Sequence, residues 1–355
     1  MLSFEENQKK TGSGGTQEAA VTKLPRDSET KENQAAGRRL TWWKILLTAA
    51  VFVLLLCGLD LALYPCTFMR NDIHAISTTQ YDDIIVGTSH GKMGIDPDSM
   101  EGITGRSAHN ACVGGEYAID VYYMTRLAIE KQNPTRIIYE VSPGYIVTEK
   151  EEGNNYLLFY HEFPLSLAKV EYFFDAIAET NFRTLLFPWY EYSLSYELPM
   201  VAETLTRKLT GDYSVESLKS DSQEYHESGF IERYPVDTST LQLSEDTAVF
   251  TESAVVDENM EYIEKTIDLC AENEIEFVAV ITPIPAAALG TWWDNYMEAY
   301  DYLESFFAEK GVACLNFNTD YYFEFSHEIE DYTDYDGHMN GDAAREFSKV
   351  LANLL

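Results

Sequence analysis

Between residue 66 and the end of the chain, short apolar runs alternate with longer segments in which apolar residues recur at helical spacing. The strand candidates are residues 82–88, 107–113, 136–142, 275–282 and 312–317. Helical spacing is found in residues 116–131, 257–272, 294–309 and 341–355. Parallel strands need crossover connections, which are usually helices. The alternation therefore predicts an α/β domain with a central parallel sheet.

The first strand candidate ends in a turn that carries a serine. Ile84 to Val86 form a β-branched apolar run of the kind that is buried on both faces of a parallel sheet. Gly87 ends the run, and Ser89 follows where the chain turns towards the next element. We expect this turn to hold the Ser89 hydroxyl at the carboxyl edge of the sheet.

A loop near the end of the chain supplies an imidazole with carboxylates beside it. His338 follows Asp334 by four residues and Asp336 by two, and Gly337 allows a tight turn between them. In open α/β sheets, ligands bind outside the carboxyl ends of the strands. Ser89 and His338 are therefore predicted to meet at one edge of the sheet, with Asp336 or Asp334 behind the histidine.

These residue types suit nucleophilic catalysis. A serine hydroxyl becomes a good nucleophile when an imidazole takes its proton, and a carboxylate keeps that imidazole in the right tautomer. Backbone N–H groups of Ser89 and of Gly114 or Gly115 are the candidate donors to an oxyanion. Two alternatives stay open. Asn110 is either a further donor or a structural turn residue, and His90 competes with His338 as the base.

Residues 148–250 break the strand–helix rhythm. They are aromatic and acidic, with Phe187-Pro188-Trp189-Tyr190 among them, and show little parallel-strand character. We expect a largely helical insertion that forms a lid or wall over the site.

The N-terminal part of the chain predicts a tail and a membrane anchor. Residues 1–41 have almost no large apolar residues and are expected to be a disordered cytoplasmic tail. Residues 42–65 are apolar over the length that crosses a bilayer and are bounded by Trp42, Trp43 and Tyr64. A cleaved signal peptide is the rival interpretation. A leader of more than 40 residues without a small-residue cleavage site argues against it.

Charge around the span predicts its orientation. Arg38, Arg39 and Lys44 precede it, whereas Arg70 is the only nearby cation after it. By the positive-inside rule the N-terminus is cytoplasmic, and residues 66–355 form an extracytoplasmic domain. The expected location is thus the cell membrane, crossed once.

The composition excludes one class of partner and offers no metal pattern. After residue 64 the chain has 17 Lys and Arg against 52 Asp and Glu, so nucleic acid is not an expected partner. The five cysteines show no spacing typical of a metal site, and they are Cys57, Cys66, Cys112, Cys270 and Cys314.

Several of these segments together resemble the SGNH/GDSL hydrolase superfamily. The resemblance covers roughly residues 75–355 and is closest to the membrane-anchored extracytoplasmic branch that includes the DltD family and is related to polysaccharide O-acetyltransferases. The residues that carry it are Ile85-Val86-Gly87-Thr88-Ser89-His90, Gly94-Ile95-Asp96-Pro97, Asn110 with Gly114-Gly115, Val278 to Pro283, and Asp336-Gly337-His338-Met339-Asn340 with Phe347-Ser348. In the insertion, Phe163-Pro164-Leu165-Ser166 with Lys169, and Leu186-Phe187-Pro188, resemble the same branch.

The resemblance implies a flavodoxin-like three-layer sandwich, with Ser89 as nucleophile, His338 as base and an aspartate as its orienting partner. It also implies no metal and no cofactor. Two departures stand out. The superfamily's Gly-x-Asn-Asp block is replaced by Glu140-Val141-Ser142-Pro143-Gly144, and the Asp-x-x-His spacing is absent because residue 335 is Tyr. The Asp-x-His spacing resembles that of alginate-type O-acetyltransferases, which favours Asp336 over Asp334.

The expected function is that of a membrane-anchored, extracytoplasmic serine esterase or acyltransferase. Its expected substrates are acetyl or D-alanyl esters of a cell-envelope glycopolymer, either a polysaccharide or a teichoic-acid-like polymer. A membrane acyl-donor protein is a further expected partner. The alternative is a non-catalytic protein of the same fold that binds an envelope polymer or a membrane protein, and Ser89 lying far from His338 would favour it.

Overall fold

The computed structural model describes residues 28–64, 67–150, 156–178, 189, 198–210, 218–243 and 250–355. The chain divides into two units, Met1–Cys57 and Gly58–Leu355. The segment Phe187-Pro188-Trp189-Tyr190 lies outside the described residues except for Trp189, and so does Cys66. The four described cysteines, Cys57, Cys112, Cys270 and Cys314, are free thiols.

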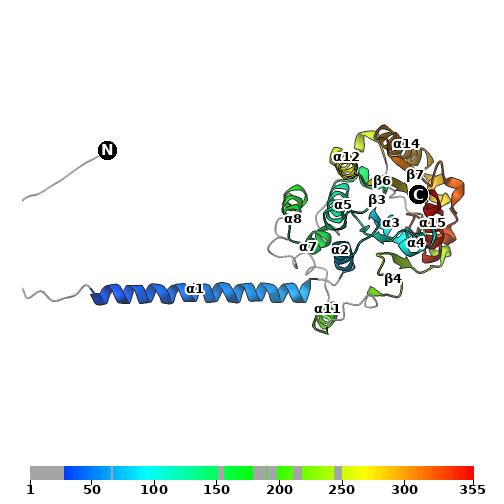
Figure 1. Ribbon diagram of the computed structural model, residues 1–355. Coiled ribbons are helices and arrows are strands. Elements are labelled where there is room, and N and C mark those ends of the chain that lie inside the picture. Colours follow the sequence, from blue (N-terminus) through cyan, green and yellow to red (C-terminus); the bar gives the residue numbers. More distant parts are fainter. Residues whose placement is uncertain are drawn as a thin grey trace, which may run out of the picture. The chain divides into compact units, whose positions relative to one another are not determined.

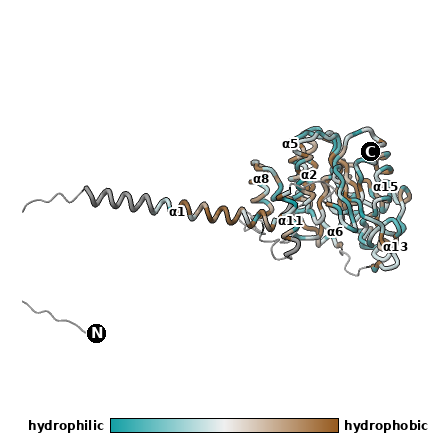
Figure 2. Tube along the Cα trace, turned by 90° about the horizontal axis from the view of Figure 1, so that it is seen from below, coloured by the Kyte–Doolittle hydropathy of each residue, from teal (hydrophilic) through white to brown (hydrophobic). Residues whose placement is uncertain are grey.

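The first helix, α1 (Ser28–Leu63), covers residues 42–63 of the predicted span 42–65. Its segment Thr41–Leu63 is long and apolar enough to cross a membrane, and it is the only such segment in the described part of the chain. It forms the continuous apolar stretch of α1 in Figure 2. The helix begins at Ser28, so it extends into the tail that was predicted to be disordered up to residue 41. The Glu, Lys, Gln and Ala residues of that stretch are good helix formers and continue the helix from the apolar segment.

Five parallel strands form the central sheet in the order β2-β1-β3-β6-β7. All five lie within the predicted strand segments. They are β1 (Asp83–Gly87), β2 (Ala108–Asn110), β3 (Arg136–Glu140), β6 (Glu276–Ile281) and β7 (Ala313–Asn316). The predicted parallel sheet is confirmed.

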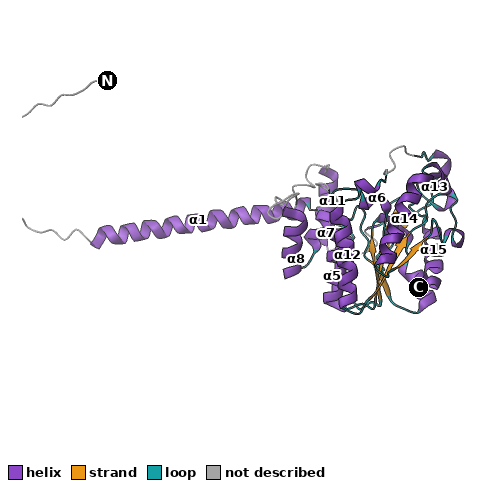
Figure 3. Ribbon diagram, turned by 90° about the horizontal axis from the view of Figure 1, so that it is seen from above, coloured by secondary structure: helices purple, strands orange, loops and turns teal. Residues whose placement is uncertain are grey.

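Alternate residues of each strand enter opposite layers of core, which makes the fold a three-layer sandwich, as predicted (Figures 1 and 3). In β1, Ile84 and Val86 pack into one cluster and Ile85 into the other. The first cluster includes residues of α2 (Met69–Thr78), α5 (Ala118–Gln132), α12 (Asp257–Glu272) and α14 (Trp293–Glu309). The second includes residues of α4 (Pro97–Thr104) and α15 (Gly341–Leu354). Three short helices, α3 (Ser89–Gly94), α6 (Pro143–Ile146) and α13 (Ala286–Thr291), follow strands at the carboxyl edge.

The insertion contains helices and one feature that the sequence did not predict. Its described helices are α7 (Tyr156–Glu162), α8 (Leu167–Tyr172), the π-helix η1 (Phe173–Ile177), α11 (Leu198–Thr210) and the 3-10 helix η4 (Thr238–Thr240). It also contains an antiparallel hairpin of β4 (Gln223–Tyr225) and β5 (Ile231–Arg233). These strands are three residues long and partly charged, so they show no apolar alternation, and packing against the body decides their conformation.

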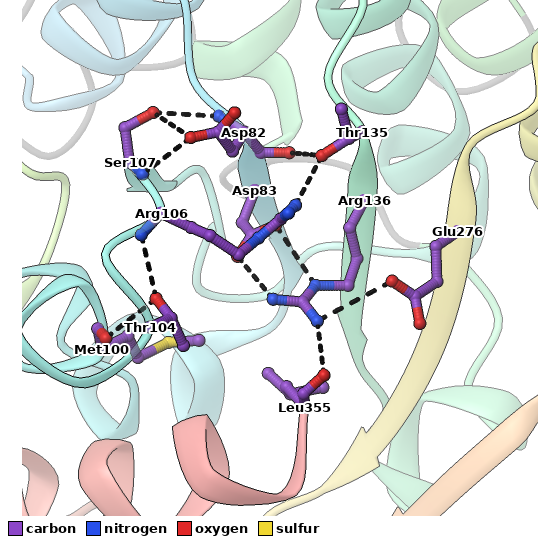
Figure 4. Close-up of polar contacts among 10 residues, drawn as sticks. All are labelled: Asp82, Asp83, Met100, Thr104, Arg106, Ser107, Thr135, Arg136, Glu276 and Leu355. Atoms are coloured by element: carbon purple, nitrogen blue, oxygen red, sulfur yellow. Dashed lines mark hydrogen bonds and ion pairs between the residues drawn. The ribbon is translucent and has the colours of Figure 1, made fainter.

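An ion-pair network centred on the buried side chains of Asp83 and Arg136 holds the amino edge of the sheet, opposite the edge where Ser89 lies (Figure 4). Asp83 receives 2.6 Å hydrogen bonds from both Arg106 and Arg136. Arg136 also donates to the carbonyl of Leu355 at 3.0 Å and lies 3.7 Å from Glu276. The two guanidinium groups compensate the buried carboxylate of β1 and tie the neighbouring strands β1, β3 and β6 to the C-terminus.

Candidate active site

Ser89 is presented by a strand–turn–helix junction. Thr88 is the N-cap of α3, and its side chain accepts a hydrogen bond from the backbone N–H of His90 at 3.3 Å. Oε2 of Glu140, at the end of β3, accepts from both the backbone N–H of Thr88 at 2.8 Å and its hydroxyl at 2.7 Å. Ser89 is therefore the first helical residue after a turn that two strands fix.

Two glycines allow this junction to approach β3 closely. Gly87 has a φ of +139°, and a Cβ atom there would lie 2.3 Å from the carbonyl oxygen of Glu140. A Cβ atom at Gly91 would lie 2.9 Å from Cβ of Glu140 in β3 and 2.7 Å from Sγ of Cys112, which follows β2. Any side chain at either position would push α3 away from the sheet.

The structure brings Ser89 and His338 together across 249 sequence positions. Oγ of Ser89 lies 2.8 Å from Nε2 of His338, and Nδ1 of His338 lies 2.8 Å from Oδ2 of Asp334. A carboxylate can only accept, so Nδ1 carries a proton. In the tautomer with its single proton on Nδ1, Nε2 is the acceptor for the Ser89 hydroxyl. These three side chains form one continuous hydrogen-bonded chain.

The preferred prediction that Asp336 is the partner of His338 is wrong, and Asp334 takes that place. Oδ1 of Asp334 accepts from the backbone N–H of Asp336 at 3.1 Å and from that of His338 at 3.2 Å. This turn bends the loop back over the Asp334 carboxylate and leaves Asp336 exposed at its tip. Gly337 closes the loop with a φ of +107°, where a Cβ atom would lie 2.7 Å from Ile284.

The Asp334 carboxyl is held in its charged form. Partial burial alone would raise its pKa. The hydrogen bonds and charge of His338, together with the charge of Arg233, outweigh that effect and leave the pKa below its usual value. Nη1 of Arg233 lies 4.0 Å from Oδ2 of Asp334. Arg233 belongs to β5, so the hairpin of the insertion forms a wall beside the site.

His90 is not placed to act as the base for Ser89. Nδ1 of His90 lies 4.0 Å from Oε1 of Glu140, and its ring lies 4.7 Å from the ring of His338. Burial and the neighbouring His338 lower the pKa of His90 to about 3. His90 is thus a neutral ring packed beside the ring that contacts Ser89.

Glu140 is a residue of the site that the sequence reasoning did not single out. It is fully buried, and burial raises its pKa even though Thr88 and Gly91 donate hydrogen bonds to it. A carboxyl group directly after the run Ile137-Ile138-Tyr139, at the end of a fully buried strand, was the signal that could have identified it.

Asn110 has a structural role. Its amide nitrogen donates to the carbonyls of Gly91 at 2.8 Å and Ile95 at 2.7 Å, and its Oδ1 accepts from the backbone of Cys112 at 3.1 Å. These bonds use the side chain to tie α3 to the end of β2. Of the two interpretations that the sequence left open, the geometry favours the structural one.

Gly114 and Gly115 lie in the turn that follows β2. The backbone N–H of Val113 donates to the carbonyl of Gly87 at 2.9 Å, which joins this turn to the end of β1 just before Ser89. Gly115 has a φ of +72°. Their role as oxyanion donors, together with the backbone N–H of Ser89, stays a prediction.

A buried cluster of charged and polar side chains bonds α3 to the elements packed against it. Nζ of Lys92 lies 2.7 Å from Oδ2 of Asp72 and donates to the carbonyl of Asn110 at 2.8 Å. Oδ1 of Asp72 lies 3.2 Å from Nε2 of His109 and accepts from the hydroxyl of Tyr225 at 2.7 Å. The cluster joins α2, α3, β2 and β4, so it fixes the helix that begins at Ser89.

A cavity of about 170 Å³ lies beside His90, which directly follows Ser89 in the chain. His90, Glu140 and Asp336 contribute polar groups, and its remaining lining includes Ser142, Phe250, Ile284, Tyr296 and Tyr300. Within the described ranges, no group of three or more His, Cys, Asp or Glu side chains is arranged to hold a metal ion.

Comparisons with known proteins include a solved structure of limited similarity. It is a chain from Desulfitobacterium hafniense DCB-2, described as a lipolytic protein of the G-D-S-L family. The TM-score is 0.35 at 11% sequence identity, and the match covers 77% of this chain and 99% of that one. No family model and no curated protein matches the sequence. At this TM-score the likeness adds nothing to the geometry of the site.

Proposed function

We propose that the protein is a serine-dependent acyl-ester hydrolase or acyltransferase. Ser89 is the nucleophile, His338 the general base and Asp334 the residue that orients the base. The observation that carries the proposal is the unbroken hydrogen-bonded chain from Oγ of Ser89 through His338 to Asp334 at the carboxyl edge of the sheet.

The geometry suits a two-step acyl transfer. Oγ of Ser89 attacks the ester carbonyl while Nε2 of His338 takes the hydroxyl proton, a contribution of about 10²–10⁴-fold. The tetrahedral intermediate then expels the alcohol, which receives that proton from His338. Water or an acceptor hydroxyl next attacks the acyl-serine, again giving its proton to His338, and the proton returns to Ser89 as the product leaves. Asp334 stabilises the imidazolium that forms in each step.

The oxyanion requires donors that are already in place. The backbone N–H groups of Ser89, Gly114 and Gly115 are proposed for this role, since the turn after β2 is bonded to the end of β1. One such donor contributes about 10²–10³-fold to the rate in other acyl-transfer enzymes.

The proposed setting is the outer face of a membrane. The segment Thr41–Leu63 supports an anchor, and the cations Arg38, Arg39 and Lys44 support a cytoplasmic N-terminus. The proposed substrates are acetyl or D-alanyl esters of a cell-envelope glycopolymer, with a membrane acyl-donor protein as partner. The cavity beside His90 and Asp336 is compatible with a small acyl group.

One observation counts against the alternative of a non-catalytic protein, which rests on the missing Gly-x-Asn-Asp block. A large separation of Ser89 and His338 would have favoured that alternative, whereas the two side chains lie 2.8 Å apart.

Labelling with a fluorophosphonate tests the proposal. The full-length chain in detergent is treated with the reagent and also assayed on p-nitrophenyl acetate. Wild type is expected to be labelled and active, and Ser89→Ala to lose both properties. Ser239→Ala is the control, because Ser239 is exposed and is not among the residues that line the cavity. Labelling of Ser89→Ala equal to that of wild type would refute the role of Ser89.

A further inference from the structure

We propose that the exposed apolar face of α8 and η1 inserts into the surface of the membrane that α1 spans, so that the extracytoplasmic body rests on the bilayer. This inference rests on the membrane anchor proposed above and is independent of the serine chemistry.

An apolar stripe runs along α8 and η1. Leu167, Val170 and Phe174 recur at the spacing of one helical face, and their exposed fractions are 71%, 52% and 66%. Leu165, just before α8, is 96% exposed. The other face of the same segment is buried against the body and comprises Ala168, Tyr172, Ala176 and Ile177. Amphipathic helices that lie on membranes expose such a stripe.

The acidic side chains of this segment are engaged with α5. Glu171 accepts a hydrogen bond from Arg126 at 2.5 Å, and Asp175 accepts one from the Tyr123 hydroxyl at 2.6 Å. They are thus held by partners on the body, and the stripe itself consists of apolar side chains.

The segment is tied to the end of α1 through α7. Tyr64, directly after α1, packs its ring 5.8 Å from that of His161 in α7. Nζ of Lys169 in α8 donates to the carbonyl of His161 at 3.1 Å and to that of Phe163 at 2.6 Å. The first turn of α8 is therefore bonded to the same residue that contacts the end of the span.

A second element of the insertion meets the same end of α1. Nζ of Lys208 in α11 donates to the carbonyl of Tyr64 at 2.6 Å and to that of Leu61 at 3.0 Å. Its neighbour Leu209 is 74% exposed. Residues that contact the end of a membrane-spanning helix lie near the headgroups, where exposed leucine and phenylalanine side chains reach lipid.

The chemistry of the stripe favours lipid chains over charged headgroups. The body is strongly acidic, so an anionic surface would repel it, whereas apolar side chains bind equally well to an uncharged bilayer. Because α8 packs on α5, which begins beside the Gly114–Gly115 turn, this contact would also fix the orientation of the site above the membrane.

Spin labels that report depth in the bilayer test the inference. The full-length chain, with Cys57, Cys66 and the partly exposed Cys314 replaced by Ser, is labelled at Leu167→Cys, Leu54→Cys or Phe323→Cys. It is reconstituted into phosphatidylcholine vesicles with and without phosphatidylglycerol. Phe323 is the control, because it is an exposed apolar side chain like Leu167 but follows β7, at the other edge of the sheet from β2. Leu54 reports on the span itself.

At Leu167, collisions of the label with oxygen are expected to exceed those with a water-soluble nickel chelate in both kinds of vesicle. The same order is expected at Leu54 and the reverse order at Phe323. A Leu167 label that behaves like Phe323 while Leu54 is in lipid would overturn the inference and indicate a water-facing or protein-binding stripe. Lipid contact only with phosphatidylglycerol would also overturn it. A Leu54 label in water would refute the membrane anchor and the inference together. Fluorophosphonate labelling of Ser89 in the same vesicles tests the proposed serine chemistry separately.

Discussion

Asp334 contacts Nδ1 of His338 at 2.8 Å, on the opposite nitrogen from the one that faces Ser89. Asp336, although nearer to His338 in sequence, stands exposed at the tip of the loop. The roles of the two carboxylates can therefore be separated by replacing each of them alone.

Asp334→Asn is expected to lower kcat on p-nitrophenyl acetate by about 10³–10⁴-fold, because the amide no longer holds the tautomer that accepts the Ser89 proton. Asp336→Asn is the comparison variant. Asp336 lines the cavity but is not the partner of Nδ1 of His338, so kcat is expected to fall far less than in Asp334→Asn. Fluorophosphonate labelling rates should follow the same order. An equal loss in both variants, or a loss confined to Asp336→Asn, would contradict the assignment.

His90 predicts a specific pH dependence of stability. Its pKa is about 3 in the folded protein, against about 6.5 in an unfolded chain. Between these values the unfolded state binds one more proton, so the free energy of unfolding falls as the pH falls below about 6.5, by about 1.4 kcal/mol per pH unit. Urea unfolding of wild type and His90→Gln at pH 7 and pH 4 measures this slope. The variant should lose less stability on acidification, and identical slopes would show that His90 is not held neutral.

Much of the fold follows from local patterns. Buried parallel strands appear as β-branched apolar runs, and Ile84, Ile138 and Val280 lie in runs of this kind. Because the carboxyl ends of parallel strands share one edge, the contact of Ser89 with His338 could be predicted although 249 positions separate them.

The remaining features depend on tertiary contacts that no spacing records. The choice of Asp334 over Asp336 is made by the turn that the Asp334 side chain itself forms, so sequence distance to His338 is a poor guide. Two hydrogen bonds hold the hairpin of β4 and β5 on the body. The Tyr225 hydroxyl donates to Asp72, and Glu232 accepts a 2.5 Å hydrogen bond from Arg345. Those partners lie on α2 and α15, far away in the sequence.

Gly87→Ala is expected to destabilise the protein by about 3 kcal/mol or more. The positive φ costs about 1–2 kcal/mol in a residue with a side chain, and the new methyl group would collide with Glu140. Gly105→Ala is the control, since Gly105 has a φ of +67° but no atom within 4 Å of the added carbon. The free energy of unfolding of Gly105→Ala should fall only by the backbone cost of about 1–2 kcal/mol. Urea unfolding in detergent measures it for both variants. Equal losses in the two variants would show that close packing of Gly87 on β3 is unimportant.

The buried pair of Lys92 and Asp72 yields the last prediction. Lys92→Met leaves the Asp72 carboxylate buried without its cation, which is expected to cost about 3–5 kcal/mol in urea unfolding. Adding Asp72→Asn to that variant removes the uncompensated charge and should recover part of the loss. Lys349→Met is the control. Nζ of Lys349 lies 2.6 Å from Oε1 of Glu346, nearly the same separation, but both side chains are exposed, so its loss should stay within about 0.5 kcal/mol. Comparable losses for Lys92→Met and Lys349→Met would mean that burial does not set the strength of the Lys92 pair and that the cluster does not hold α3 behind Ser89.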